Sequence, residues 1–243
     1  MLHVSIVTPT YHRRKFIPTL ITIYANQTYP KEHMEWIIID DGQESVEDLF
    51  TEAATRIPNI HYIRVEEKLR IGAKRNRLNQ EARAPIIISM DDDDYYPPER
   101  VQMVVDAFTQ HPHADLVGSS EMNLYYIDDQ TIYTMGPFMP NHATNGTLAY
   151  RKRYAEKHRY DEFVTKAEEV SFLETYTYPM IQMDPMKTIL VICHDDNTVD
   201  KQSLRKKHLS DPRKPREKMR VSSYTLSDIV KEPSVYDFYK SLQ

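Results

Sequence analysis

Short apolar runs rich in β-branched residues alternate, over the first half of the chain, with stretches in which apolar residues recur every three or four positions. Val101, Val104, Val105 and Phe108, for example, have the spacing of one helix face. The runs predict strands at residues 4–7, 36–39, 60–65, 85–90 and 116–118, and the stretches between them predict helices at 13–27, 44–56, 72–83 and 97–110. This alternation predicts an α/β fold with a Rossmann-like, mostly parallel central sheet flanked by helices.

The second half of the chain is less regular. Residues 124–127 and 131–135 predict a hairpin, and further strands are expected at 147–150, 180–183 and 188–193, with a helix at 166–176. Residues 201–220 contain nine Lys and Arg residues and two prolines, which indicates a flexible or lid-like segment. Residues 227–242 predict a terminal helix. We therefore divide the chain into a domain at 1–198, with halves of about 1–118 and 119–198, and a segment at 199–243.

Composition narrows the class of protein. The chain has 243 residues, of which 40% are hydrophobic and 28% charged, and a net charge of −5, which is typical of a globular protein and does not indicate a nucleic-acid partner. Its apolar runs are far shorter than the ~20 residues of a membrane span, and its start does not resemble a signal peptide. Cys193 is the single cysteine, so we expect a reducing, cytoplasmic compartment.

Polar residues follow three of the predicted strands. They are Thr8 to Tyr11 after the first strand, Asp40-Asp41-Gly42 after the second, and Asp91 to Asp94 after the fourth. In parallel α/β sheets, ligands bind beyond the carboxyl ends of the strands. The three clusters therefore predict one ligand site at that edge of the sheet.

The four consecutive aspartates raise the question of what neutralises them. Each adjacent pair repels by on the order of 1 kcal/mol in water, and by more in a partly dry site. In an extended chain Asp91 and Asp93 share one side, where two carboxylates can hold Mg²⁺ or Mn²⁺ with positions left for phosphate oxygens. The alternative is an acidic cap on the helix that follows at residue 97, although one cap needs one aspartate.

Three segments together resemble a known family. They are VSIVTPTYHRRKFIPTLITIYANQTYP, EWIIIDDG and IGAKRNRLNQEARAPIIISMDDDD, and their order and spacing resemble the inverting family 2 glycosyltransferases of the GT-A fold over roughly residues 3–195. The resemblance implies a smaller mixed acceptor-side region, a nucleoside-diphosphate sugar donor with UDP as the default, and a glycan or glycoconjugate acceptor. It also implies Mn²⁺ or Mg²⁺ as cofactor. The chain is expected to be one module of a longer multi-domain transferase.

The resemblance assigns donor-binding residues in the first half. Thr8, Pro9 and Tyr11 match the loop that packs on the base and ribose, and Asp40 or Asp41 matches the acidic residue that accepts from the base. The segment Gly72 to Asn76 matches the family's Gly-x-x-x-Asn region, which places Lys74 and Arg75 by the base or pyrophosphate. The alternatives are a simple Asp-Gly turn and two exposed helix cations.

The resemblance also implies roles within the aspartate run. Asp91 matches the position near the ribose, and Asp93 matches the metal-binding end of the Asp-x-Asp motif. Asp92 stands where the family more often has a small residue, and we place it with the donor-binding residues; which of the four carboxylates contact metal stays open. His194, at the end of a late strand, is the candidate second metal ligand, the alternative being a loop histidine.

The acidic pair Glu168-Glu169 matches the family's catalytic pair, usually Glu-Asp, and Glu169 is its candidate general base. The alternative is that both residues complement a helix dipole. Asn145-Gly146-Thr147 falls at the acceptor-side loop. The basic residues Arg205 to Lys207 would fold over the pyrophosphate or touch anionic lipid, unless they form a solvated linker.

Two other classes are compatible with these residues. A sugar-nucleotidyltransferase shares a similar base-binding half, but its loop after the first strand usually contains glycine, and TPTYHRRK has none. A non-catalytic nucleotide- or glycan-binding module would bind without turnover. A dehydrogenase is disfavoured, because no G-x-G-x-x-G follows a predicted strand.

Overall fold

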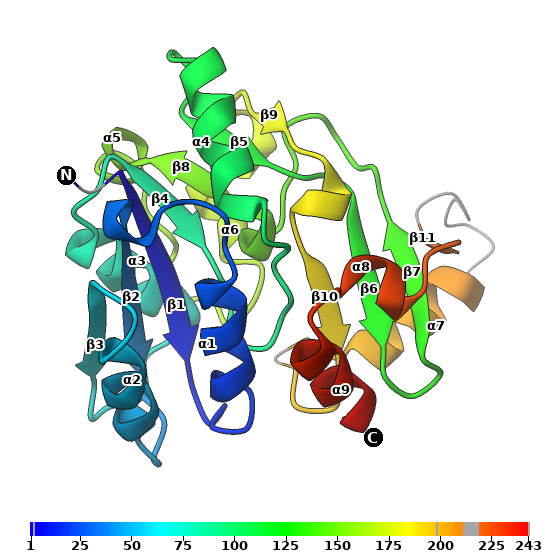
Figure 1. Cartoon of the computed structure of the whole chain (residues 1–243). Coiled ribbons are helices and arrows are strands. Elements are labelled where there is room, and N and C mark those ends of the chain that lie inside the picture. The colour runs from blue at the N-terminus through cyan, green and yellow to red at the C-terminus, as the bar shows by residue number, and fades with distance from the viewer. Residues whose placement is uncertain (2, 198, 211–218, 243) are drawn as a thin grey trace.

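The computed structural model describes residues 1, 3–197, 199–210 and 219–242. Its larger sheet has seven strands in the order β3-β2-β1-β4-β8-β5-β9 (Figure 1). The first four strands along this order are parallel, and β8 is antiparallel to both of its neighbours. The strands are β1 Val4–Thr10, β2 Met34–Asp40, β3 Ile60–Arg64, β4 Ile86–Ser89, β5 Leu116–Gly118, β8 Ala149–Arg151 and β9 Ile181–Gln182. The predicted mostly parallel sheet is confirmed.

Alternate side chains of the strands enter different cores. Ile6 pairs in register with Trp36 and Ile88, and these three side chains belong to the core on one face. Their neighbours Val7 and Ile37 belong to a second core on the other face. Because both faces are covered, the central strands are apolar throughout, which is why they read as continuous runs in the sequence.

Helices cover both faces of the sheet. The first core receives side chains from α1 (Ile17–Ala25), α2 (Glu47–Ala54) and α4 (Arg100–Gln110), and the second from α3 (Ile71–Glu81) and the short α5 (Lys152–Ala155) and α6 (Glu169–Phe172). The predicted helix at 13–27 begins later than expected, with Pro18 in its first turn, where a missing N–H costs least. The residues before it are left free to approach the aspartate run.

The predicted helix at 166–176 is wrong in its extent. Only α6 and the 3₁₀ turn η3 (Glu174–Tyr176) form there. Ala167 and the three residues of η3 have positive φ angles between 47° and 63°. A right-handed helix cannot continue through left-handed residues, so the segment folds as two short turns. The other 3₁₀ turns are η1 (Lys31–His33), η2 (Asn145–Thr147) and η4 (Pro185–Lys187).

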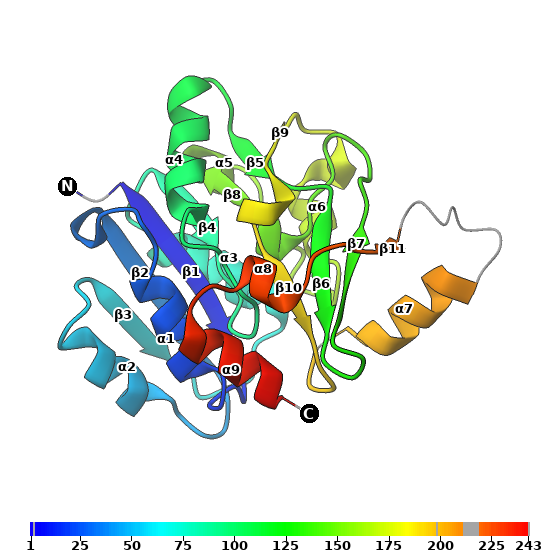
Figure 2. The ribbon, with the colours of Figure 1, turned by 45° about the vertical axis from the view of Figure 1, so that its right-hand side comes forward.

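A second sheet of four strands lies beside the first, in the order β10-β6-β7-β11. Its strands are β6 Met122–Tyr126, β7 Thr131–Met135, β10 Leu190–Cys193 and β11 Met219–Val221. The predicted hairpin is confirmed as the antiparallel pair β6–β7. Figure 2 shows α7 (Lys201–Ser210) at the outer side of this sheet, away from α1 and α2.

The basic segment differs from the prediction of a flexible or lid-like stretch. Residues 201–210 form α7, and residues 219–221 form an edge strand of the second sheet; residues 211–218 of that prediction lie outside the described part. Arg205 explains the difference: it forms ion pairs with Asp128 and Asp129 at the hairpin turn, and its guanidinium lies 4.3 Å from the Tyr126 ring centroid. Its charge is therefore satisfied within the fold, on the hairpin.

The C-terminal segment folds as two helices, where one was expected. They are α8 (Leu226–Ile229) and α9 (Pro233–Ser241), and Pro233 begins the second. Phe238 of α9 packs edge-to-face on Phe16 at a ring distance of 5.6 Å. The tail thereby joins the main core, while the division at residue 198 stays a prediction. Within the described ranges, no helix is both long and apolar enough to cross a lipid bilayer.

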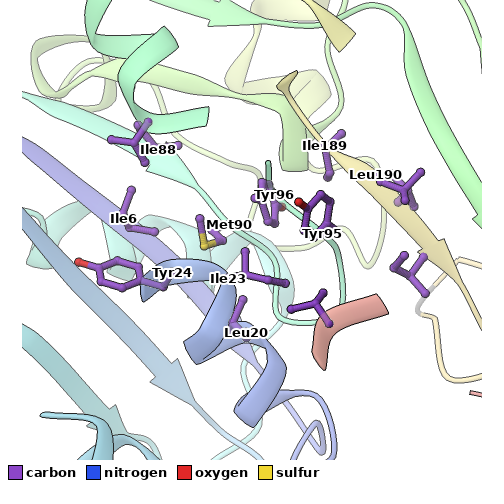
Figure 3. Close-up of a cluster of buried hydrophobic side chains, with 14 of the residues drawn as sticks. Ile6, Leu20, Ile23, Tyr24, Ile88, Met90, Tyr95, Tyr96, Ile189 and Leu190 are labelled. Atoms are coloured by element: carbon purple, nitrogen blue, oxygen red, sulfur yellow. The ribbon is translucent and has the colours of Figure 1, made fainter. Parts of the chain in front are cut away.

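The two sheets are joined at the end of β4. Tyr95 and Leu190 exchange two backbone hydrogen bonds of 3.0 and 2.8 Å. Figure 3 shows Met90, Tyr95 and Tyr96 between the side chains of α1 and those of Ile189 and Leu190. This apolar cluster fixes the chain on both sides of residues 91–94, so the aspartate run crosses from one sheet to the other.

Candidate active site

An open pocket of about 810 Å³ lies at the junction of the two sheets, beyond the carboxyl ends of β1 and β4. It brings together most of the site residues predicted from the sequence. Those that line it are Pro9, Tyr11, Lys74, Arg75, Asp91, Asp92, Asp93 and Glu169. The expectation that separate strand ends converge on one edge is therefore confirmed for β1 and β4.

Two predicted donor-binding residues are directed into the protein. Thr8 is fully buried, and its hydroxyl accepts a hydrogen bond of 2.9 Å from the indole of Trp36. Asp40 accepts from the Gly42 amide at 2.8 Å and from the Tyr62 hydroxyl at 2.6 Å. The reason is that β1 and β2 extend beyond the predicted runs, to Thr10 and Asp40, so both side chains still lie within the sheet.

Asp41 acts on the pocket through a neighbour. Its carboxylate forms a buried ion pair with Lys74 and accepts from the Leu69 amide at 2.7 Å. Lys74 also donates to the carbonyl of Thr10 at 3.0 Å, and burial lowers the pKa of its ammonium. Leu69, Lys74 and Thr10 line the pocket. Asp41 thus fixes the wall next to Tyr11.

The aspartate run is divided by its contacts. Asp94 is buried and accepts a hydrogen bond of 2.9 Å from the amide of Ile192 in β10. Asp91, at the other end, pairs with Arg75 at 3.0 Å. Asp94 is thus turned toward β10 and Asp91 toward α3, and Asp92 and Asp93, which share Arg13, are the candidates for a cation.

Asp93 lies in a cluster formed by residues from three distant segments of the chain. Its Oδ2 is 3.1 Å from His194 Nε2, 3.3 Å from Asn197 Nδ2 and 3.4 Å from Arg13 Nε. Burial alone would raise the pKa of Asp93, but the His194 hydrogen bond and the charge of Arg13 hold it below its ordinary value. His194 is buried and lies against Phe16 at a ring distance of 4.7 Å.

The donor set of this cluster fits a divalent cation. Adjacent ligands of an octahedral ion held at about 2.1 Å lie about 3.0 Å apart. Asp93 Oδ2 and His194 Nε2, at 3.1 Å, have that separation. Asp92 Oδ2 is buried without a hydrogen-bond partner, and burial together with the Asp93 charge raises the pKa of Asp92 to about 8. Both observations indicate a site with too little positive charge.

The protein would supply few ligands to such an ion. In the described ranges, His, Cys, Asp and Glu form no group of three or more with the geometry of a metal site. An ion held by Asp93 and His194 would therefore keep most of its positions for ligand oxygens, as Mg²⁺ usually does when it is bound by one or two carboxylates plus phosphates.

Arg75 organises the opposite side of the pocket. Its Nε donates to Glu168 at 2.7 Å, and its Nη1 donates to Asp91 at 3.0 Å. The amide of Asn145, oriented with its oxygen toward the guanidinium, accepts from Nη1 at 2.6 Å. Burial opposes the charge of Arg75, yet the two carboxylates keep its pKa well above the ordinary value. The predicted cation is thus buried in an ion-pair network.

Glu169 is the carboxylate that this network leaves for the pocket. Burial and the neighbouring Glu168 charge raise its pKa to about 7. Its partner in the sequence, Glu168, is neutralised by Arg75 at 2.7 Å. A carboxylate with a pKa near neutrality can accept a proton at physiological pH, as general bases do. The helix-dipole alternative is weak here, since α6 has a single turn.

The loop that carries Glu168 and Glu169 rests on α3. A Cβ atom at Gly72 would lie 2.0 Å from the carbonyl oxygen of Asp161, so only glycine allows this approach. Asn76 exchanges two hydrogen bonds of 2.9 Å with the backbone of Tyr160. Gly72 and Asn76, predicted as part of a donor-side motif, therefore position the acidic pair.

Two site residues were missed in the sequence. Arg13 and Asn197 both contact Asp93. The only sequence signals were the basic residues of TPTYHRRK, a segment that begins within β1, and the Asp-Asn turn after β10. Gly146 was placed on the acceptor side by its motif. A Cβ there would lie 3.3 Å from Asp91 Oδ2 and 2.8 Å from the Cδ1 methyl of Ile189, so a larger residue would have to displace that methyl group.

The wall contributed by the second sheet is apolar. Met122, Leu124 and Val191 of the sheet line it with Ile189, which precedes β10, and Lys201 and Leu204 of α7 also line the pocket. Lys206 and Lys207 are exposed on α7. Of the basic residues at 201–210 and 219–220, Lys201 is therefore the one that lines the pocket.

The family described as Glycosyl transferase family 2 matches residues 5–164 of the chain. The poly(ribitol-phosphate) beta-N-acetylglucosaminyltransferase TarS of Staphylococcus aureus is 26% identical over 118 residues, which are 48% of this chain and 20% of that protein. The putative teichuronic acid biosynthesis glycosyltransferase TuaG of Bacillus subtilis is 26% identical over 100 residues, 41% of this chain and 39% of that protein. The matched part thus spans between a fifth and two fifths of these relatives.

Solved structures resemble the chain over more of its length. The structure of TarS residues 1–349 in complex with UDP-GlcNAc has a TM-score of 0.65 at 17% identity, covering 81% of this chain and 60% of that one. The mannosyltransferase PcManGT from Pyrobaculum calidifontis, in complex with GDP-Man and Mn²⁺, has a TM-score of 0.65 at 13% identity. The match covers 88% of this chain and 66% of that one. At such identities the likeness shows the fold, and it confirms the predicted GT-A fold.

Proposed function

Because this chain belongs to glycosyl transferase family 2, we propose that it moves a sugar from a nucleoside-diphosphate sugar to a hydroxyl group of a glycan or glycoconjugate by direct displacement with inversion. The observation that carries this proposal is the position of Glu169, a carboxylate with a pKa of about 7 that lines the same pocket as Asp92 and Asp93. A proton acceptor and an anion-binding cation site on one pocket are the two requirements of such a reaction.

The donor is proposed to lie along the edge of the larger sheet. Pro9, Tyr11 and Leu69 offer a surface for the base, and the Lys74–Asp41 pair stiffens that wall. We propose a UDP-linked donor, because the TarS structure contains UDP-GlcNAc; the PcManGT structure with GDP-Man makes a guanosine carrier the first alternative to test.

The cation site is proposed to bind Mn²⁺ or Mg²⁺ through Asp93 and His194. An ion held by these residues would supply positive charge beside a leaving diphosphate. Asn197 steadies both ligands, with Nδ2 at 3.3 Å from Asp93 Oδ2 and 3.0 Å from His194 Nε2. Phe16 and the Tyr95–Leu190 bridge hold the same two residues in place from behind.

Glu169 is proposed to take the proton from the acceptor hydroxyl as the new bond forms. Glu168 is unsuited to this task because Arg75 holds it as an ion pair. The substitution of Glu for the family's more usual Asp lengthens the reach of the base by one methylene. The geometry of the loop on α3, fixed by Gly72 and Asn76, sets where that base points.

Metal-dependent nucleotide binding is the direct test of the donor site. We expect UDP to bind more tightly with Mn²⁺ than without it, and we expect Asp93→Ala to abolish that difference, since the ion would lose its carboxylate ligand. A calorimetric titration of both proteins with and without Mn²⁺ measures this, preceded by a thermal-shift screen of UDP, GDP and deoxythymidine diphosphate sugars. Equal UDP affinity in all four titrations would contradict the proposed cation site.

The pH dependence of turnover tests the proposed base. Since Glu169 must be unprotonated to act, kcat/KM is expected to fall about tenfold for each pH unit below about 7, where its pKa lies, and to level off above it. An initial-rate profile between pH 5 and 9 measures this. If kcat/KM instead fell only below pH 4.5, the ordinary pKa of a glutamate, the catalytic base would not be a carboxylate in the buried environment of Glu169.

The two alternative classes predict different outcomes in the same assays. A nucleotidyltransferase would consume a sugar phosphate and a nucleoside triphosphate, and a non-catalytic module would bind the nucleotide without releasing sugar. Hydrolysis of the nucleotide sugar without an acceptor, with and without added triphosphate, separates these from the proposed transferase. The family match favours transfer.

A further inference from the structure

We propose that Arg13 is the resident counter-cation of Asp92 and Asp93 in the metal-free protein, and that a divalent cation must displace its guanidinium to bind. Arg13 would thereby set the metal affinity of the site. This inference rests on the proposed cation site at Asp93 and His194, and it adds a residue that the sequence motifs do not include.

The position of the guanidinium is the first observation. Arg13 Nε lies 3.4 Å from Asp93 Oδ2 and 3.8 Å from Asp92 Oδ1. The same Asp93 oxygen faces His194 Nε2 at 3.1 Å. An ion that used this oxygen and this nitrogen would share the oxygen with the guanidinium, and two positive groups on one carboxylate oxygen repel each other.

The distribution of charge along the aspartate run is the second observation. Asp91 is paired with Arg75, and Asp94 accepts from the Ile192 amide. Among the lysines and arginines that the structure describes, Arg13 is the one that forms ion pairs with both remaining carboxylates, and its side chain is only 13% exposed. Lys74 and Lys201 also line the pocket, and their charges act on Asp92 and Asp93. Asp92 Oδ2 nevertheless stays buried without a hydrogen-bond partner. The site holds its own cation and still has room for more positive charge.

The surroundings of Arg13 provide a place for the displaced side chain. Arg13 lines the main pocket and also a second hollow of about 580 Å³ beside it, which reaches toward Glu44 and Asp196. Its guanidinium already donates to the backbone carbonyl of Asp196. In that hollow Asp196 pairs with Lys15 and Glu44 pairs with Arg14, so a guanidinium rotated toward it would join these existing ion pairs.

The test is the affinity of the nucleotide-free protein for Mn²⁺, measured by electron paramagnetic resonance of the unbound ion and by calorimetry. Arg13→Gln removes the charge, and we expect it to bind Mn²⁺ about ten- to hundredfold more tightly than the unchanged protein, because like charges held together oppose binding strongly. Arg13→Lys keeps the charge and is expected to remain close to the unchanged protein. Arg83→Gln, on an exposed arginine that lines neither the pocket nor the hollow, is the matched control and is expected to have no effect.

Unchanged or weaker Mn²⁺ binding by folded Arg13→Gln would overturn this inference and leave the proposed function intact. Absence of Mn²⁺ binding in every variant would overturn the cation site and the inference together. If Arg13→Gln fails to fold, the displacement is tested on the unchanged protein by nuclear magnetic resonance. The ¹⁵Nε resonance of Arg13, which is assigned by its loss in Arg13→Lys, is expected to shift on titration with Mg²⁺. A resonance that does not move while Mg²⁺ binds would overturn the displacement.

Discussion

Replacement of Glu169 by glutamine is expected to lower kcat by about 10²- to 10⁴-fold while binding of the nucleotide sugar is retained. The amide has nearly the shape of the carboxylate but cannot accept the proton of the acceptor hydroxyl. Because Glu168 is held by Arg75 at 2.7 Å, it is not free to replace its neighbour as the base. The loss should therefore appear in kcat, with the affinity for the donor unchanged.

The measurement combines a transfer assay with a calorimetric titration of the donor. Glu156→Gln is the matched control, since Glu156 is an exposed glutamate at the end of α5 and the same substitution there is expected to have no effect. Full turnover by Glu169→Gln would remove this residue from the mechanism. Loss of donor binding together with turnover would indicate that the substitution disturbs the pocket, and Glu169→Asp, which keeps the carboxylate, would then separate charge from shape.

Replacement of Arg75 by methionine is expected to lower the free energy of unfolding by about 3–5 kcal/mol. The side chains of Arg75 and Glu168 are both only 9% exposed, so little of their interaction is screened by water. Without the guanidinium, the buried Glu168 and the partly buried Asp91, whose side chain is 23% exposed, become neighbouring carboxylates that have lost their shared counter-charge. The loop that presents Glu169 should loosen as well, so turnover should fall with stability.

Urea unfolding monitored by circular dichroism measures this change. Arg77→Met, two residues along the same helix at a partly buried position, is the control and is expected to cost far less. The double variant Arg75→Met with Glu168→Gln should recover part of the loss, because it removes one of the two unpaired charges. A cost below about 1 kcal/mol for Arg75→Met would mean that the pair behaves like an exposed salt bridge.

The positions of the first five strands along the chain were predictable from the sequence. Their apolar runs are continuous because both faces of the sheet are covered, and the stretches between them have the spacing of helix faces. These are local patterns, and each depends on residues within one element. The convergence of Tyr11 and the aspartate run follows from the same patterns, since parallel strands end on one edge.

Other outcomes depended on contacts between residues far apart in the chain. Thr8 looked like a loop residue until the pairing of β1 with β2 placed its hydroxyl under Trp36. Residues 201–210 looked flexible because their charges had no local partner, and Asp128 and Asp129 supply one from the hairpin turn.

The sequence by itself determined that four carboxylates would stand at the end of a buried strand, because strand and run are adjacent in the chain. Only the tertiary structure decided what each of them does. The Tyr95–Leu190 bridge holds β10 against the aspartate run. Asp94 therefore accepts a hydrogen bond from a backbone amide of β10, and Asp93 lies next to His194. Arg75 of α3 forms an ion pair with Asp91. The physical reason is that a charge is neutralised by what lies nearest in space, and here those neighbours come from segments 16 to 101 residues away.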